Sequence, residues 1–448
     1  QTCALPISGG DKLDYDGETM VNSADYTVIK CHWNSVLSSP GYKYSTMDAG
    51  NMYLESKLPK PRYVRFKMAQ IPEAIQAQYG LHKLVDAAGY VYARIDKAWY
   101  GLKEAGRIAG DDIRDHLAAF GYHESKYTPG FFTHEARDIS FTLVVDDLGA
   151  KWKRLKDFEH LRDCLSLKCS MKAGMEAKQH AGTGLKRGYA NRALGCSMGG
   201  YIGAALEELE HALPKQKHHA PSKAARPGYG CSAQHAEGGT SRKLSKDEIK
   251  RIQKVAGKFL FLARAIDNAM LHALNEIACD VSDGTAKTLE AAQYLLNYIA
   301  SSPRPKARLH ASGMALQAGS DAAFNARPKG RSRAGGYRCL GSKSNDMLNA
   351  PILALPKVAK GAMGSAAEAE AAAARASAHE AAPARQCLEE MGHPQPAARA
   401  RAGNAAAKGL ASNAIKQKRS KVLGRRFWWL KGREAQLQFH AIWERSEE

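Results

Sequence analysis

The sequence predicts an α+β fold, because strand-like and helix-like segments recur along the chain. The short runs at 90–95 and 139–145 are rich in β-branched and aromatic residues, which is typical of strands. Residues 104–120 carry apolar side chains close to helical spacing, and Gly121 follows where such a helix would end. Amphipathic segments after Ser245 and at about 285–300 predict two further helices.

Size and charge limit the possible organisation and partners. A chain of 448 residues has room for roughly three domains of about 150 residues. The formal charge of +20 and the pI near 9.5 favour an anionic partner, nucleic acid before a membrane surface. No apolar run approaches the ~20 residues of a membrane span, and no leader with a basic and then an apolar segment is visible.

The cysteines indicate the redox environment of the protein, and the two chain ends indicate whether the termini are natural. The nine cysteines are dispersed without a Cys-x-x-Cys pair, which favours reduced thiols in an intracellular protein. Residues 1–8 and 445–448 resemble translated sequencing-adaptor oligonucleotides, so we expect neither end to be natural and exclude both from fold reasoning.

Two segments of unusual composition flank the predicted helices. The basic stretch 214–242, with Pro, Gly and the adjacent pair His218-His219, is typical of a surface linker, although adjacent His side chains can also bind metal. Ser245 with Glu248 forms a capping-box pattern at the start of a helix. The Ala-dominated stretch 362–407 predicts a helix, since alanine is the best helix former.

The C-terminal stretch 416–429 interleaves Lys and Arg with Phe427, Trp428 and Trp429. Basic and aromatic interleaving suits nucleic-acid contact. Aromatic residues at this spacing also occur in cores, so both interpretations remain open.

Asp146 and Asp147 end the strand-like run at 139–145 and are followed by Leu148-Gly149. An Asp-Asp-x-Gly stretch is commonly a solvated turn. The alternative is a magnesium site on a hairpin tip, which needs a further acid. Asp48 is the candidate, because an Asp followed five residues later by an aromatic, here Tyr53, is the layout of a polymerase palm.

These motifs resemble the polymerase region of copia-type LTR-retrotransposon polyproteins. Residues 97–107, Lys-Ala-Trp-Tyr-Gly-Leu-Lys-Glu-Ala-Gly-Arg, are similar to the family signature Lys-Ala-Leu-Tyr-Gly-Leu-Lys-Gln-Ala-Pro-Arg. Gly121-Tyr122, the run at 128–131 and Val145-Asp146-Asp147 follow in the family's order. Val replaces the family's Tyr before the first Asp, and Gly106 replaces its Pro.

The resemblance implies reverse transcription by a two-metal polymerase. Asp48 and Asp146 would bind two Mg²⁺ ions, with Mn²⁺ as a substitute, and Asp147 would support them. Tyr53 would exclude a ribose 2′-hydroxyl by its bulk.

Three residues of the signature match the segment that lies near the incoming nucleotide and template: Gly101, Lys103 and Arg107. The charges of Lys103 and Arg107 would meet phosphates. The alternative for these two is an ordinary solvated start of a helix.

The C-terminal part resembles a copia-type RNase H domain that has lost ligands. Asp321 and Glu370 match two of its carboxylates, whereas Gly403 and Gly424 stand where the other two are expected. Because loss of ligands from a two-metal centre removes most of its rate, we predict that this domain does not cleave.

By resemblance, the chain is organised as truncated reverse-transcriptase fingers with a palm, a helical thumb/connection, and a degenerate α/β RNase H-like domain. These domains correspond to 9–175, 176–310 and 311–444.

The expected function is RNA-directed DNA polymerase, with RNA template, DNA primer, RNA–DNA hybrid and dNTPs as partners. A cytoplasmic retroelement particle and the nucleus both remain open as locations. A non-catalytic nucleic-acid-binding remnant is the alternative, because few basic fingers residues precede Asp48.

Overall fold

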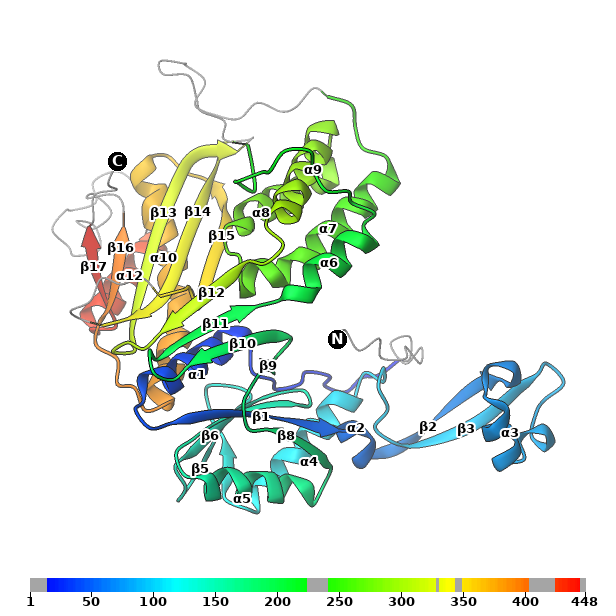
Figure 1. The fold of residues 1–448 in the computed structure, drawn as a ribbon. Helices are drawn as coiled ribbons and strands as arrows, with labels where there is room; N and C mark the ends of the chain where they lie inside the picture. Colours follow the sequence, from blue (N-terminus) through cyan, green and yellow to red (C-terminus); the bar gives the residue numbers. More distant parts are fainter. Residues whose placement is uncertain (1–13, 224–240, 328–329, 343–348, 403–423, 444–448) are drawn as a thin grey trace. The chain divides into compact units, whose positions relative to one another are not determined.

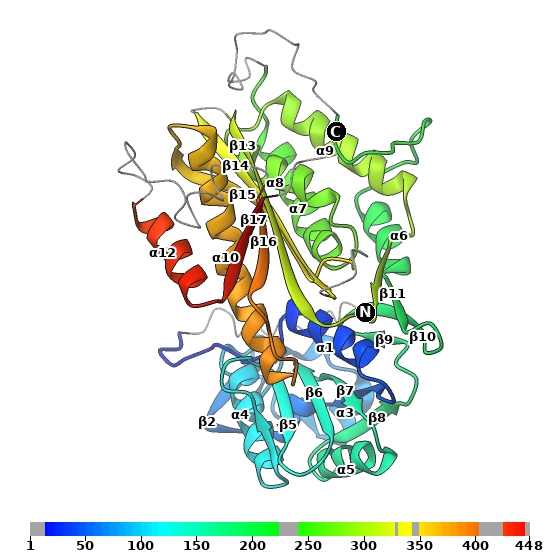
Figure 2. The same ribbon diagram turned by 90° about the vertical axis from the view of Figure 1, so that its left-hand side faces the viewer.

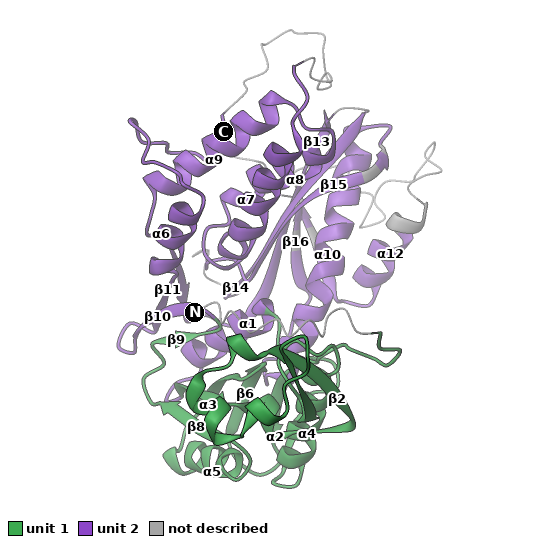
Figure 3. Cartoon of the chain, turned by 90° about the vertical axis from the view of Figure 1, so that its right-hand side faces the viewer, with its two compact units in different colours: residues 1–25, 43–181 green, residues 26–42, 182–448 purple. Residues whose placement is uncertain are grey.

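The computed structural model describes residues 14–223, 241–327, 330–342, 349–402 and 424–443. The chain forms two compact units, coloured separately in Figure 3. Unit 1 comprises residues 1–25 and 43–181, and unit 2 comprises residues 26–42 and 182–448. Both units contain helices and strands, which confirms the predicted mixture. The domain boundaries at 175/176 and 310/311 stay predictions.

Unit 1 is built on a six-stranded sheet with the order β4-β5-β6-β7-β1-β8, in which every neighbouring pair is antiparallel (Figure 1). The strands of unit 1, including three outside this sheet, are β1 (Lys43–Gly50), β2 (Lys57–Lys67), β3 (Tyr90–Lys97), β4 (Tyr122–Glu124), β5 (Phe131–His134), β6 (Ile139–Val144), β7 (Asp147–Trp152), β8 (Ser170–Gly174) and β9 (Gln179–His180). Its helices are α2 (Met52–Glu55), α3 (Glu73–Gln78), α4 (Ala105–Ala118) and α5 (Leu155–Ser166).

Helices α4 and α5 supply apolar side chains to one face of this sheet. Ile113 and Leu117 from α4, together with Phe158 and Leu161 from α5, join a buried cluster with alternate residues of β1, β6 and β7. The remaining face of β1 therefore carries the polar side chains, because successive residues of a strand point to opposite faces.

The predicted elements of unit 1 are confirmed with small shifts of their ends. The strand expected at 90–95 extends to Lys97, and the helix expected at 104–120 spans Ala105–Ala118. The strand expected at 139–145 ends at Val144, because Val145 has a positive φ of 59° and belongs to the following turn.

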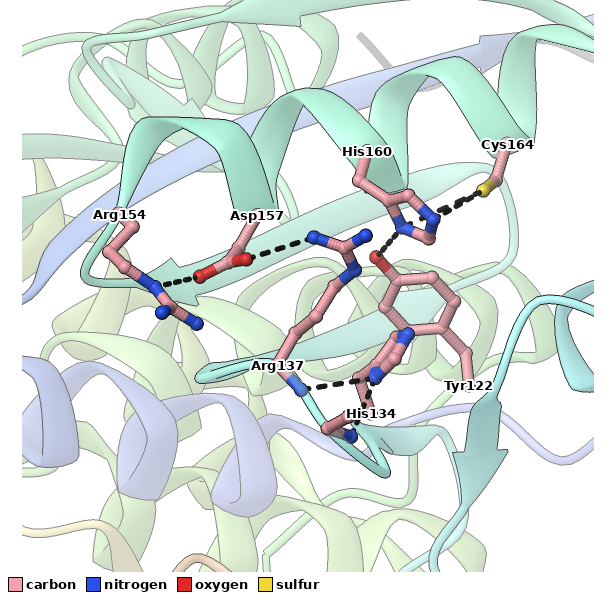
Figure 4. Close-up of polar contacts among 8 residues, drawn as sticks. Tyr122, His134, Arg137, Arg154, Asp157, His160 and Cys164 are labelled. Carbon is pink, nitrogen blue, oxygen red and sulfur yellow. Dashed lines mark hydrogen bonds and ion pairs between the residues drawn. The ribbon is translucent and has the colours of Figure 1, made fainter.

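A buried ion triad holds the start of α5 (Figure 4). The carboxylate of Asp157 is fully buried and accepts hydrogen bonds from Arg154 Nε at 2.8 Å and Arg137 Nη1 at 3.2 Å. Burial opposes the charge of Asp157, but the two arginines outweigh it and lower the pKa of this carboxyl. The same region contains a hydrogen bond between Tyr122 Oη and His160 Nδ1, at 3.0 Å.

Unit 2 contains a five-stranded mixed sheet, β15-β14-β13-β16-β17, and a smaller antiparallel arrangement of β10, β11 and β12. Its strands are β10 (Thr183–Gly188), β11 (Ala193–Ser197), β12 (Lys306–His310), β13 (Ala315–Arg327), β14 (Arg331–Gly341), β15 (Leu353–Ala362), β16 (Ala398–Ala402) and β17 (Phe439–Trp443). Its helices are α1 (Tyr26–Ser38), α6 (Gly199–Glu208), α7 (Lys246–Ala265), α8 (Met270–Asp280), α9 (Ala286–Ser301), α10 (Ala366–Glu390) and α12 (Gly424–Ala435).

The helices predicted after Ser245 and near 285–300 are confirmed as α7 and α9. The capping box is present, since Ser245 Oγ accepts from Glu248 N at 3.2 Å and Glu248 Oε2 accepts from Ser245 N at 2.8 Å. Part of the predicted linker, residues 224–240, lies outside the described residues, and residues 214–223 form no helix or strand.

The helix predicted for 362–407 is wrong at both ends. It covers only α10, and residues 398–402 form strand β16 in parallel with β13 (Figure 2). Helix α10 stops just before Gly392, which adopts the left-handed conformation at φ 82°. Pro394 and Pro396 prevent the helix from continuing beyond it. Alanine side chains of α10 are buried beside β13 and β14, because small residues allow the helix to approach the sheet closely.

Cysteines and apolar helices add two findings about the described residues. The seven cysteines within them are free thiols. No helix in this part of the chain has the length and apolar character needed to span a bilayer.

Candidate functional site

Asp48, Asp146 and Asp147 come together at one end of the sheet of unit 1. Asp48 on β1 lies directly opposite Asp147 on β7, and the β6–β7 hairpin turns through Val145 and Asp146. Ala49 N donates to Asp146 O at 2.9 Å, so the turn is tied to β1. The sequence-predicted triad is therefore a set of spatial neighbours.

The hairpin turn is conformationally strained at Val145. A positive φ of 59° is unfavourable for a β-branched residue. The side chain of Val145 is 39% exposed, so core packing is not what holds it there. Such strain persists only where the surrounding structure fixes it and is concentrated at functional sites.

Burial and neighbouring carboxylates disfavour the ionised forms of Asp146 and Asp147. Burial raises the pKa of Asp146, and Asp48 raises it further. Burial also raises the pKa of Asp147 to about 7, and Asp146 and Asp48 add to this effect against a hydrogen bond from Ala181 N to Asp147 Oδ2 at 2.7 Å. A cation or a proton at this position would relieve the repulsion.

Whether these residues fit Mg²⁺ depends on donor type and on geometry. Carboxylate oxygens are the hard donors that Mg²⁺ prefers, and the excess negative charge favours a cation. Among the residues that the structure describes, however, no group of three or more His, Cys, Asp or Glu is placed so that it could hold a metal ion. The donor chemistry fits the ion, whereas the ligands are adjacent without converging.

Two residues that the sequence did not single out, Tyr44 and His180, lie near Asp147. His180 is buried, with Nδ1 3.0 Å from Tyr44 Oη and Nε2 3.9 Å from Asp147 Oδ1. Burial lowers the pKa of His180 to about 3, so its ring is neutral at pH 7. No motif surrounds this histidine, and its role depends on the contact between β9 and the polar face of β7.

Gly149 leaves the space that Tyr44 and His180 occupy. A Cβ at Gly149 would overlap Tyr44 Oη and lie 2.6 Å from His180 Cε1. Gly149→Ala is expected to destabilise unit 1 by about 1–3 kcal/mol, because these buried rings cannot move aside freely. Urea unfolding measures this effect. Gly110→Ala is the control, since its Cβ would meet the flexible Arg114 Nη2 at 3.3 Å and Val21 Cγ1 at an ordinary contact distance of 3.8 Å, and should not lower stability.

Tyr53 lies on α2, immediately after β1. Its ring stacks on Tyr100 with centroids 4.7 Å apart, and its pKa is raised by burial and then by Asp146. Tyr53 therefore belongs to the same neighbourhood as the carboxylates.

The predicted residues Gly101, Lys103 and Arg107 surround the start of α4. Gly101 has a positive φ of 98°, and both Gly101 and Lys103 are exposed. Arg107 pairs with Glu18 and, at 3.2 Å, with Asp111. Its guanidinium is thus engaged with acids in this structure, and contact with a phosphate would have to compete with them.

The second predicted pair, Asp321 and Glu370, is adjacent in unit 2. Glu370 on α10 is buried and its Oε1 accepts from Ala322 N at 3.2 Å, while Asp321 on β13 is exposed. Gly403 lies outside the described residues, and Gly424 begins α12. Two carboxylates are therefore present where four were expected.

The pKa of Glu370 is raised to about 7, by burial first and then by Asp321. The folded state therefore holds a proton that the unfolded state loses, so stability should fall as pH rises from about 4.5 to 7. Glu370→Gln is expected to remove this fall and to be about 1–3 kcal/mol more stable than wild type at pH 8. Urea unfolding at pH 4 and pH 8 checks it; an equal difference at both values would contradict the assignment.

No protein-family model matches the sequence. A solved foamy viral protease-reverse transcriptase in complex with RNA/DNA hybrid is similar over 93% of this chain and 46% of that chain, with 12% identity and a TM-score of 0.47. A foamy viral protease-reverse transcriptase in complex with dsDNA is similar over 92% of this chain and 70% of that chain, with 11% identity and a TM-score of 0.44. This chain thus spans about half the length of the first.

Proposed function

We propose that this chain is an RNA-directed DNA polymerase of the copia-type retrotransposon class, with its nucleotidyl-transfer site in unit 1. The observation that carries the proposal is the register that sets Asp48 opposite Asp147, next to the strained turn at Val145 and Asp146. A solvated turn would not need strain, burial and a third acid on the neighbouring strand.

Asp48 and Asp146 would hold divalent metal, and Asp147 would support them. Mg²⁺ bound there would lower the pKa of an attacking hydroxyl and offset the charge of a triphosphate. A hydrogen bond from Ala181 N holds the Asp147 carboxylate in place, and the neutral ring of His180 lies 3.9 Å from it. The Tyr53–Tyr100 stack lies beside Asp146. RNA template, DNA primer and dNTPs are the proposed partners.

We propose further that the part of unit 2 that resembles an RNase H domain is inactive. Asp321 and Glu370 supply two carboxylates, and two are too few for a two-metal centre of this type. An RNA–DNA hybrid assay with Mg²⁺ or Mn²⁺ tests this, and hydrolysis in either ion would refute it.

A second function, nucleic-acid binding without turnover, is favoured by one observation: the carboxylates do not converge as metal ligands among the described residues. Extension of an oligo-dT primer on poly-rA, with dTTP and Mg²⁺, separates the two functions. The polymerase proposal predicts extension that EDTA abolishes. Salt-dependent binding of the hybrid without extension would favour the binding protein instead.

A further inference from the structure

Strands β2 and β3 form a two-stranded antiparallel ribbon, which is a sheet of its own (Figure 1). One face of this ribbon is anchored to the rest of unit 1. Val64 and Ile95 on this inner face join a small core with Trp99, and Arg62 Nε donates to the buried carboxylate of Glu104 at 2.8 Å. The opposite, outer face is therefore the one that remains available to a partner.

The outer face pairs cations with aromatic rings. Residues directly opposite each other in an antiparallel pair share a face. Each of the three outer cross-strand pairs combines one tyrosine with one cation: Tyr63 with Arg94, Tyr92 with Arg65, and Tyr90 with Lys67. Every tyrosine of this face therefore has a cation directly across the ribbon, while Arg65 and Lys67 follow each other on β2 and Tyr92 and Tyr90 on β3.

Two of the three rings are open to solvent. Arg65 lies over the ring of Tyr90, 4.8 Å from its centroid, whereas Tyr63 is 70% exposed and Tyr92 is 59% exposed. Tyr63 and Tyr92 are diagonal neighbours, about 7 Å apart. This is the spacing of their backbone positions, so the two exposed rings offer neighbouring stacking surfaces on one face of the ribbon.

The charge of this region complements a polyanion. Residues 57–97 contain eight Lys and Arg against three Asp and Glu. Asp96 pairs with Arg94 at 3.1 Å, and Asp86 accepts from the backbone of Ala88 and Tyr90. Asp86 also lies close enough to Tyr92 and Arg65 for both to lower its pKa, so beside the exposed rings Arg65 and Lys67 outnumber this acid two to one.

We infer that the outer face of the β2–β3 ribbon binds single-stranded nucleic acid, with bases stacked on Tyr63 and Tyr92 and phosphates near Arg65 and Lys67. A single strand offers unstacked bases, which a duplex keeps inside its helix. This interaction surface is separate from the carboxylates at the β6–β7 hairpin and requires neither metal nor dNTP.

Fluorescence anisotropy with a labelled oligo-dT tests the inference in the full chain, carrying Asp146→Asn, without divalent cation or dNTP. Replacing both Tyr63 and Tyr92 with Ser should weaken binding about ten-fold or more. Replacing both with Phe keeps the rings and should retain affinity. Replacing Arg65 and Lys67 with Gln should lower the slope of log affinity against log salt by about 1.4.

Tyr127→Ser is the matched control, because Tyr127 is 62% exposed and lies outside the ribbon. It should change affinity by less than about two-fold if stacking is specific to the ribbon. Unchanged affinity in the double Ser variant would overturn the inference. Equal loss in Tyr127→Ser, or equal affinity for poly-glutamate, would overturn it as well. The outcome is independent of primer extension, so the polymerase proposal can fail while this one stands.

Discussion

Asp146→Asn is expected to lower the rate of primer extension by at least about a thousand-fold. Metal-assisted charge stabilisation contributes several kcal/mol to such reactions, and each 1.36 kcal/mol is ten-fold in rate. Asn keeps the shape of Asp146 but removes its charge, and this charge raises the pKa of Asp147. The fold should therefore tolerate the change, and hybrid binding should persist.

Asp163→Asn is the control for this result. Asp163 is exposed on α5 and pairs with Arg162 at 2.8 Å, so its loss removes one carboxylate from unit 1 without touching the hairpin. Single-nucleotide incorporation at saturating hybrid measures both variants. If Asp146→Asn extends primers as fast as Asp163→Asn, then Asp146 has no part in the chemistry.

Asp157→Asn is expected to destabilise unit 1 by about 2–4 kcal/mol. Hydrogen bonds to a charged group contribute about 1.5–3 kcal/mol each, and Asp157 accepts two from Arg154 and Arg137 in a fully buried position. The upper end is limited because both arginines are partly exposed and can turn towards water.

Hydrogen exchange of peptides from α5, together with urea unfolding, measures the loss at Asp157. Asp163→Asn again serves as the control, and as an exposed pair on the same helix it should change stability by less than about 0.5 kcal/mol. Faster exchange confined to unit 1 is expected. Equal unfolding midpoints for the two variants would show that the buried triad contributes little.

Local patterns in the sequence were sufficient where a helix or strand is decided by its own residues. The capping residues Ser245 and Glu248 and the apolar spacing behind them predicted α7, which is confirmed. Alanine content alone extended the helix near 362–407 too far, because a helix ends where Gly392 and the following prolines stop it. Composition reports helix propensity, whereas single residues set the boundary.

Some residues of the candidate site could likewise be predicted from local sequence, and others could not. Asp48, Asp146 and Asp147 were found from short motifs, in which Asp48 lies within β1, Asp146 follows β6 in the turn, and Asp147 begins β7. Tyr44 and His180 were missed, since they meet only through contacts between distant segments over Gly149. The pairing of tyrosines with cations on the outer face of β2 and β3 could not be predicted either, because it depends on the cross-strand register, which the separate sequences of the two strands do not contain.

Direct titration of a divalent cation tests the central claim, that the carboxylates of β1 and the β6–β7 hairpin form a metal site. Mn²⁺, followed by electron paramagnetic resonance, should bind the wild-type chain with its hybrid and dNTP present. Asp48→Asn and Asp146→Asn should each weaken this binding at least about ten-fold, while Asp163→Asn leaves it unchanged. Identical Mn²⁺ binding by wild type, Asp48→Asn and Asp146→Asn would contradict the account.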